Sequence, residues 1–198
     1  MKVLILCEES QVVTTAFRER GHDAYSCDLQ PCSGGHPEWH IQGDALQFLE
    51  DDWYWYWDLL IVHPPCNYIS NMSNCRIREP GRKELRRKGM EFFMKFTGAR
   101  TIRVCIENPR GLPEREYRRA DQIIQPHQFG HAVSKATCLW LKNLPPLAPT
   151  DIVEPVRKYD GKRWRTWVDA GAKAHTSKCR SKTFPGIAKA MAEQWGLY

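Results

Sequence analysis

The chain has 198 residues, with 29 Lys and Arg against 23 Asp and Glu, so its formal net charge is +6. Its 42% hydrophobic content excludes a disordered tail, and its length suits one domain with a single core. No apolar run reaches the roughly 20 residues of a membrane span, and the apolar start is too short for a secretory signal. These features predict a cytoplasmic protein with no membrane partner and with reduced cysteines.

The first 28 residues predict a strand, a helix and a second strand. Lys2–Cys7 is a short, continuously apolar run, which is typical of a buried strand. Apolar residues at helical spacing follow in 12–17, Gly21 is a plausible C-cap, and His22–Cys27 predicts a strand that ends at Asp28. This order implies a parallel sheet with a right-handed crossover.

The same alternation continues to the end of the chain. Further strands and helices are predicted at His40–Ile41, Ala45–Leu49, Asp58–Val62, Gly81–Gly98, Thr101–Ile106, Thr137–Leu141 and Phe184–Trp195. Repeated β-then-α units predict a single α/β domain, 1–198, with a mostly parallel sheet and helices on both faces. Ligands of such sheets bind at the carboxyl ends of the strands.

Two polar motifs follow neighbouring predicted strands. The first is Pro64-Pro65-Cys66, in which two prolines stiffen a turn that can present a nucleophilic thiol. The second is Glu107-Asn108-Pro109, which places a carboxylate at the next strand end. Taken singly, a buried cysteine and a solvated turn explain them as well. Together they form a specific pair.

This pair resembles the catalytic motifs of the DNA cytosine-5 methyltransferases. Their catalytic loop carries Pro-Cys after a strand, and a later strand ends in Glu-Asn-Val; here Pro65-Cys66 and Glu107-Asn108 match, and Pro109 replaces the valine. The resemblance implies a Rossmann-like, class I SAM-dependent methyltransferase fold. It also implies that Cys66 adds to C6 of a flipped cytosine in DNA while Glu107 acts as the acid at N3.

The likeness extends to two later segments. The segment 129–141 resembles the family's Tyr-Gly-Val-Pro-Gln-x-Arg-x-Arg motif and the strand after it, with Lys135 and Thr137 in place of the two arginines. By the resemblance Lys135 is a third catalytic residue, near cytosine O2, although a loop lysine before a buried strand is an equal explanation. The segment 184–192 resembles the last motif, a turn into a helix near the cofactor.

The resemblance also implies S-adenosyl-L-methionine (SAM) as cofactor. Its first loop is Cys7-Glu8-Glu9-Ser10-Gln11, where the family has Phe-x-Gly-x-Gly, so the glycines that let backbone approach a ligand are missing. Glu8 or Glu9 would meet the cofactor's ammonium, Asp28 the ribose hydroxyls and Asp44 the adenine amino group. The implied cofactor-binding residues are Cys7, Glu8, Glu9, Ser10, Asp28, Asp44 and Pro64.

Positive charge is concentrated in two segments. Arg76–Lys88 has seven cations and two anions, and Arg157–Lys182 has nine cations and two anions. The resemblance makes 76–88 the catalytic-loop segment that closes over the flipped base, and it makes 145–184 a reduced target-recognition region. Solvated loops are the alternative for both. The predicted DNA contacts are Asn67, Arg76, Arg78, Arg82, Lys83, Arg163 and Arg165.

Two segments carry other hypotheses. Cys27, Cys32, His36 and His40 have a zinc-like composition, but their spacing is shorter than that of most zinc sites, so a loop without metal is expected. The aromatic segment Asp51–Trp57 is either the edge of the core or a self-association surface, which leaves a homodimer open.

The resemblance therefore implies a compact DNA cytosine-5 methyltransferase, with a phage-type enzyme as one option, acting in a bacterial or phage-infected cell. Its sequence specificity is expected to be short or relaxed, or else to be supplied by a second subunit. Two alternatives stay open. One is a pyrimidine C5-modifying enzyme that acts on a free nucleotide or on RNA. The other is an inactive homologue that only binds nucleic acid.

Overall fold

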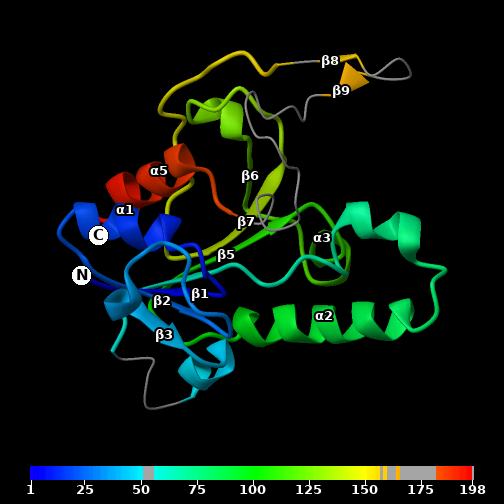
Figure 1. Ribbon diagram of the computed structural model, residues 1–198, viewed down its shortest axis with the longest axis horizontal. Helices are drawn as coiled ribbons and strands as arrows, with labels where there is room; N and C mark the ends of the chain where they lie inside the picture. The colour runs from blue at the N-terminus through cyan, green and yellow to red at the C-terminus, as the bar shows by residue number, and fades with distance from the viewer. Residues whose placement is uncertain (51–55, 157, 160–163, 166–181, 198) are drawn as a thin grey trace.

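A seven-stranded sheet forms the centre of the computed structural model, which describes residues 1–50, 56–156, 158–159, 164–165 and 182–197 (Figure 1). The strand order is β3-β2-β1-β4-β5-β7-β6. β7 runs antiparallel to both of its neighbours, and the other pairs are parallel. The strands are β1 (Lys2–Leu6), β2 (Asp23–Asp28), β3 (His40–Gln42), β4 (Leu59–Val62), β5 (Arg103–Pro109), β6 (Gln122–Ile124) and β7 (Thr137–Lys142).

This arrangement confirms the expected α/β, Rossmann-like fold with a mostly parallel sheet and helices on both faces. Helices α1 and α5 pack together on one face of the sheet, and α2 lies on the other (Figure 1). A short antiparallel pair, β8 (Lys158–Tyr159) and β9 (Trp164–Arg165), stands apart from the main sheet. The α-helices are α1 (Val12–Glu19), α2 (Arg82–Thr97), α3 (Pro113–Glu116) and α5 (Pro185–Trp195), and the 3₁₀ turns are η1 (Pro37–Trp39), η2 (Ala45–Leu49), η3 (Asn71–Arg76) and η4 (Pro126–Gln128).

The continuous apolar runs of β1 and β4 are explained by helices on both faces. Val3 and Ile5 point into the core beneath α1 and α5, whereas Leu4 and Leu6 point into the core beneath α2. Every residue of β4 is buried in the same alternating way. Each such side chain contributes roughly 1.5–3 kcal/mol on burial, so the two strands fix the centre of the sheet.

The sequence prediction of β5 was too short. It ended the strand at Ile106 and placed Glu107-Asn108-Pro109 in a turn, but these three residues belong to the strand. They pair with Leu139, Cys138 and Thr137 of the antiparallel β7. The motif is therefore held by main-chain pairing, which a single-sequence pattern could not show.

The aromatic segment is described only in part, because residues 51–55 lie outside the described ranges. Trp57 is buried and lies edge-on to Phe48 and Tyr25, so the end of the segment belongs to the core. No helix in the described ranges has the length and apolar character needed to cross a membrane.

Candidate active site

The ends of β4 and β5 bring His63 and Glu107 together. The two strands pair in parallel with Ile61 opposite Cys105. Because side chains alternate along a strand, the positions two residues further on fall side by side, on the face covered by α1 and α5. His63 Nδ1 lies 2.9 Å from Glu107 Oε2, and the two side chains are only 11% and 15% exposed. A carboxylate can only accept, so Nδ1 is the donor.

The neighbouring residue, Asn108, attaches β5 to the Pro-Pro turn on the opposite face. Its Nδ2 donates to the carbonyl oxygen of Pro64 at 2.6 Å, and the side chain is almost fully buried. Cys66 follows two residues later and opens a tight turn, in which its carbonyl accepts from the amides of Ile69 and Ser70. Glu107 and Asn108 thus hold both residues that precede Pro65-Cys66.

The chain after Cys66 is also tied to the chain after β5. The amide of Leu112 donates to Ile69 O, the amide of Asn71 donates to Arg110 O, and Ser70 forms a bridge with Gly111. A Cβ at Gly111 would lie 2.1 Å from Ile69 O, so only glycine permits this approach. The two motifs are therefore connected at three successive points.

The charge of Glu107 is stabilised by two neighbours. Burial alone would raise the pKa of this carboxyl, but the hydrogen bond and charge of His63 and the charge of Lys135 outweigh burial and lower it. Lys135 precedes β7, and its Nζ lies 5.9 Å from the centre of the Phe184 ring. Lys135 thus lies close enough to Glu107 to interact with it electrostatically, a contact that the sequence did not predict.

The glycine-free first loop reaches its shape by another route. Cys7 and Gln11, at its two ends, adopt left-handed conformations with φ of 59° and 57°. Gln11 Nε2 donates to His36 O and its Oε1 accepts from the His36 amide, which ties the loop to the segment after β2. A Cβ at Gly34 would lie 2.7 Å from Ser10 O, so that segment packs directly on the loop.

The two loop glutamates have different surroundings. Glu8 is buried, and its carboxylate accepts from the amides of Val13 and Thr14 and from the Thr14 hydroxyl, so it caps α1. Glu9 has one buried carboxylate oxygen, Oε2, without a hydrogen-bond partner in the structure. A buried, unsatisfied carboxylate oxygen is costly and suits a cationic ligand group. Of the two, Glu9 fits the cofactor's ammonium better.

Asp28 and Asp44 lie near the same loop. Burial, then the charge of Asp28, then the charges of Cys27 and Asp44, raise the pKa of the Cys7 thiol. The thiol therefore stays neutral. One oxygen of each aspartate accepts a backbone amide, from Gln30 and from Leu46, which fixes both carboxylates at consecutive strand ends.

Most of the basic segment is helical, in agreement with the helix predicted over Gly81–Gly98. Arg82 to Lys88 form the first turns of α2, and the 3₁₀ turn 71–76, which the sequence did not predict, ends at Arg76. Glutamates at helical spacing make these turns favourable, because they pair with Arg76, Arg87 and Lys88. Arg82 donates to Asn67 O and lies over the Tyr68 ring. Arg78 and Lys83 line a shallow hollow of about 470 Å³.

The remaining predicted site residues are only partly described. Arg163 lies outside the described residues, and Arg165 is placed only as part of the backbone of β9. Within the described ranges no three His, Cys, Asp or Glu side chains gather as metal ligands. Both ring nitrogens of His40 are bonded to protein atoms, the Ser26 hydroxyl and Gln30 O.

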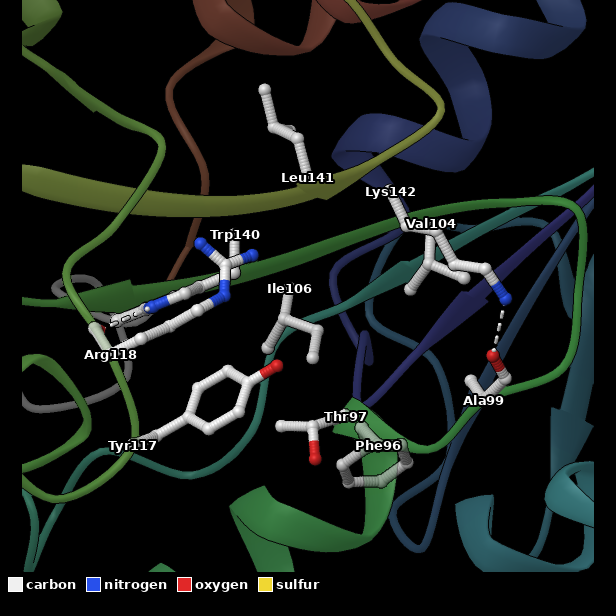
Figure 2. A pocket seen from close by; sticks show the side chains of 10 residues that line it. All are labelled: Phe96, Thr97, Ala99, Val104, Ile106, Tyr117, Arg118, Trp140, Leu141 and Lys142. Carbon is white, nitrogen blue, oxygen red and sulfur yellow. Dashed lines mark hydrogen bonds between the residues drawn. The ribbon is translucent and has the colours of Figure 1, made fainter.

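A small cavity lies apart from this site, between the end of α2 and strands β5 and β7 (Figure 2). Its volume is about 40 Å³, enough for a few water molecules. It is lined by Val104 and Ile106, which face the α2 side of β5, whereas Glu107 shares the opposite face with Cys105. Lys142 beside it donates to Ala99 O at 2.9 Å (Figure 2). The cavity is too small for a nucleotide.

Comparisons with known proteins give structural likenesses only. No protein family and no curated protein matches the chain. A prophage-encoded E. coli protein described as a candidate DNA modification methyltransferase is 15% identical with a TM-score of 0.49, over 78% of this chain and 52% of its own. A mutant of Spodoptera frugiperda DNMT2 is 16% identical with a TM-score of 0.45, over 79% of this chain and 55% of its own. The chain thus spans about half the length of these structures.

Proposed function

We propose that the protein is a SAM-dependent methyltransferase that modifies C5 of cytosine in DNA, acting in the cytoplasm. The proposal rests on the contacts between the ends of β4 and β5. Glu107 is hydrogen-bonded to His63, which follows β4, and Asn108 is hydrogen-bonded to Pro64, the first residue of the Pro-Pro turn. A cysteine and a carboxylate are thereby held at adjacent strand ends, as thiol addition to a pyrimidine requires.

The residues have complementary roles in this chemistry. Cytosine C5 is a poor nucleophile, so Cys66 adds as a thiolate to C6 and makes C5 electron-rich. Negative charge then develops at N3, where Glu107 can deliver a proton. Lys135, which already stabilises negative charge at Glu107, would compensate charge on the ring. When the thiolate leaves, the C5 proton is lost to solvent.

The first loop fits SAM in several respects. Glu9 would bind its ammonium through the unsatisfied Oε2, and the second oxygens of Asp28 and Asp44 would bind ribose and adenine. Cys7, Glu8, Ser10 and Pro64 would line the site, with Glu8 shaping it through α1. When bound, the cofactor supplies an electrophilic methyl group. The loop lies next to the catalytic turn, because the amide of His63 donates to Leu6 O at 3.0 Å.

The test is nucleoside mass analysis of DNA incubated with the enzyme and SAM. We expect 5-methylcytosine with the wild type and none with Cys66→Ser, because the hydroxyl is not ionised at neutral pH. Cys75→Ser, at an exposed thiol in η3, is the matched control and should retain activity. DNA containing 5-fluorocytosine should trap the wild type covalently and should not trap Cys66→Ser.

Parallel incubations with RNA and with dCMP separate the alternatives. If the enzyme methylates RNA or dCMP but not DNA, the methylated molecule replaces DNA as the proposed substrate. DNA binding without SAM binding by calorimetry would identify an inactive nucleic-acid-binding protein. Full activity in Cys66→Ser would rule out the covalent mechanism itself.

A further inference from the structure

His63 is a buried histidine that the proposed chemistry does not yet use. Its Nδ1 is bonded to Glu107, and its other nitrogen, Nε2, is buried without a hydrogen-bond partner in the structure. Glu107 is therefore the single hydrogen-bonding anchor that the described residues offer to the imidazole ring. Such a partner controls both the orientation of the carboxylate and its proton.

Glu107 needs that control because its lowered pKa conflicts with its role. As an acid at N3 it must deliver a proton, yet its surroundings favour the carboxylate. Among the described residues, four titratable groups interact with it: His63 after β4, Lys135 before β7, Cys105 on its own strand and Cys138 on β7. Burial raises the pKa of the Cys105 thiol, so it does not release a proton readily. His63 is the group with a hydrogen bond of 2.9 Å to the carboxylate.

We propose that His63 is a positioning residue that orients Glu107 and holds the proton that Glu107 passes to N3 of the target pyrimidine. This inference rests on the proposed function. The Nδ1–H bond occupies Oε2 and leaves Oε1 for the base. His63 directly precedes Pro64-Pro65-Cys66. The same turn therefore positions both the imidazole that holds the proton and the nucleophilic thiol.

Atoms and charges balance in this scheme. In the reactive state that the proposal requires, the pair is an imidazolium and a carboxylate, and Cys66 is a thiolate. The sulfur lone pair forms the S–C6 bond, the C5–C6 π electrons move to C4–C5, and the C4–N3 π electrons move to N3. N3 takes a proton from the Glu107 carboxyl, which takes one from Nδ1 and leaves a neutral imidazole. After methylation and loss of the C5 proton, the S–C6 bond breaks and the N3 proton returns by the same route.

Two substitutions separate positioning from proton storage. In His63→Asn the side-chain amide nitrogen can occupy the place of Nδ1, so a donor to Glu107 is kept while the titrating group is lost. In His63→Gln the amide lies further out, near the place of Nε2, and both properties are lost. His22→Gln is the control, because His22 lies at the other end of the sheet, beside Phe17 and the chain terminus.

The first measurement needs no substrate. We expect the Glu107 carboxyl carbon, followed by ¹³C NMR and assigned with Glu107→Gln, to titrate at higher pH in His63→Gln than in the wild type. The reason is that burial then acts without the opposing hydrogen bond and charge. The shift should be smaller in His63→Asn and absent in His22→Gln. An unchanged Glu107 titration in a folded His63→Gln protein overturns the inference.

The second measurement is the pH profile of single-turnover methyl transfer. We expect both His63 variants to be slower by roughly 10²-fold, with the alkaline decline of the wild-type profile lost in His63→Asn. A His63→Asn enzyme with the wild-type rate and profile overturns the role in proton storage. If the wild type transfers no methyl group, the proposed function fails, while the titration still decides whether His63 controls Glu107.

Discussion

Asn108 shows how much one buried side chain can control at the active site. Its Nδ2 donates a hydrogen bond to the Pro64 carbonyl oxygen, and this contact is buried. We expect Asn108→Leu to lower the free energy of unfolding by about 1–3 kcal/mol, because the carbonyl loses its partner at little change in volume. Urea denaturation measures this change.

Asn71→Leu is the matched control for that prediction. Asn71 is exposed, and the hydrogen bond that its Oδ1 accepts from Arg115 Nη2 is long, at 3.5 Å. Its replacement should change stability by no more than about 0.5 kcal/mol. Equal losses in both variants would show that the Asn108 contact has no special weight.

The buried thiols yield a second prediction at the scale of residues. Burial is the main cause that raises the pKa of Cys27 and of Cys138 to about 12, and it also raises the pKa of Cys105. The thiolate is the reactive form, so these three cysteines should resist labelling by a maleimide at pH 8. Exposed Cys75 should react at once. Peptide mass mapping after timed quenching tests the order, and early labelling of Cys105 would contradict it.

Sequence reasoning named candidate reacting groups but not the contacts that hold them. Cys66 and Glu107 were proposed from their residue types and motif context, and their roles stay predictions. His63 and Asn108 were missed as interacting residues, because their contacts depend on the register of β4 against β5. That register pairs residues 44 positions apart, and no local periodicity encodes it. Knowing that Ile61 faces Cys105 would have been enough to predict the His63–Glu107 pair.

At the scale of elements, the connection between the turn that carries Cys66 and the chain after β5 depends on Gly111. We expect Gly111→Ala to separate the chain after Cys66 from the chain after β5, since its Cβ would collide with Ile69 O. Methyl transfer should fall together with thermal stability. Gly98→Ala is the control, because its Cβ would meet Lys95 O at an ordinary 3.8 Å and its φ of −90° suits alanine. Calorimetric melting and activity assays compare the two, and a Gly111→Ala enzyme that behaves like Gly98→Ala would refute the prediction.

The elements that the sequence predicted are those with long apolar patterns. β1, α1, β4, α2 and α5 were predicted within about two residues of their ends. The sequence missed β6, a three-residue strand that exists only through its pairing with β7. The expected short helix 45–49 is a 3₁₀ turn, in which Asp44 accepts from the amide of Leu46. Short elements follow tertiary contacts, so local propensity does not predict them.

At the scale of the whole molecule, the sheet brings the proposed cofactor-binding residues and the proposed catalytic residues to the carboxyl ends of neighbouring strands. β1 and β4 are neighbours, so the loop after Leu6 and the turn after Val62 emerge side by side. Asp28 and Glu107 lie on the strands flanking this pair. A methyl donor and an acceptor base bound at this edge would therefore meet above β1 and β4, the most deeply buried strands.

The distribution of charge yields a prediction about the whole molecule and DNA. In 76–88 the ion pairs with Glu79, Glu84 and Glu91 neutralise Arg76, Arg87 and Lys88 within the segment. Arg78 and Lys83, which line the hollow at the start of α2, are better placed to meet phosphates. We expect R78A/K83A to weaken DNA binding at low salt and to reduce the slope of log K against log salt by about 2.

A double substitution on another face separates this site-specific effect from the loss of net charge. Arg20 and Lys189 lie on α1 and α5 or next to them, and both pair with Glu193. R20A/K189A removes two positive charges, as R78A/K83A does, but it leaves the hollow intact. It should therefore change the salt slope by much less than 2. Fluorescence anisotropy of a labelled duplex between 50 and 200 mM salt, a range over which phosphate contacts dominate affinity, measures both slopes. If the two slopes change equally, general electrostatics binds the DNA. A change confined to R78A/K83A places the DNA across the start of α2, which follows η3 and the turn that carries Cys66 along the chain. A flipped base would have to enter near that turn.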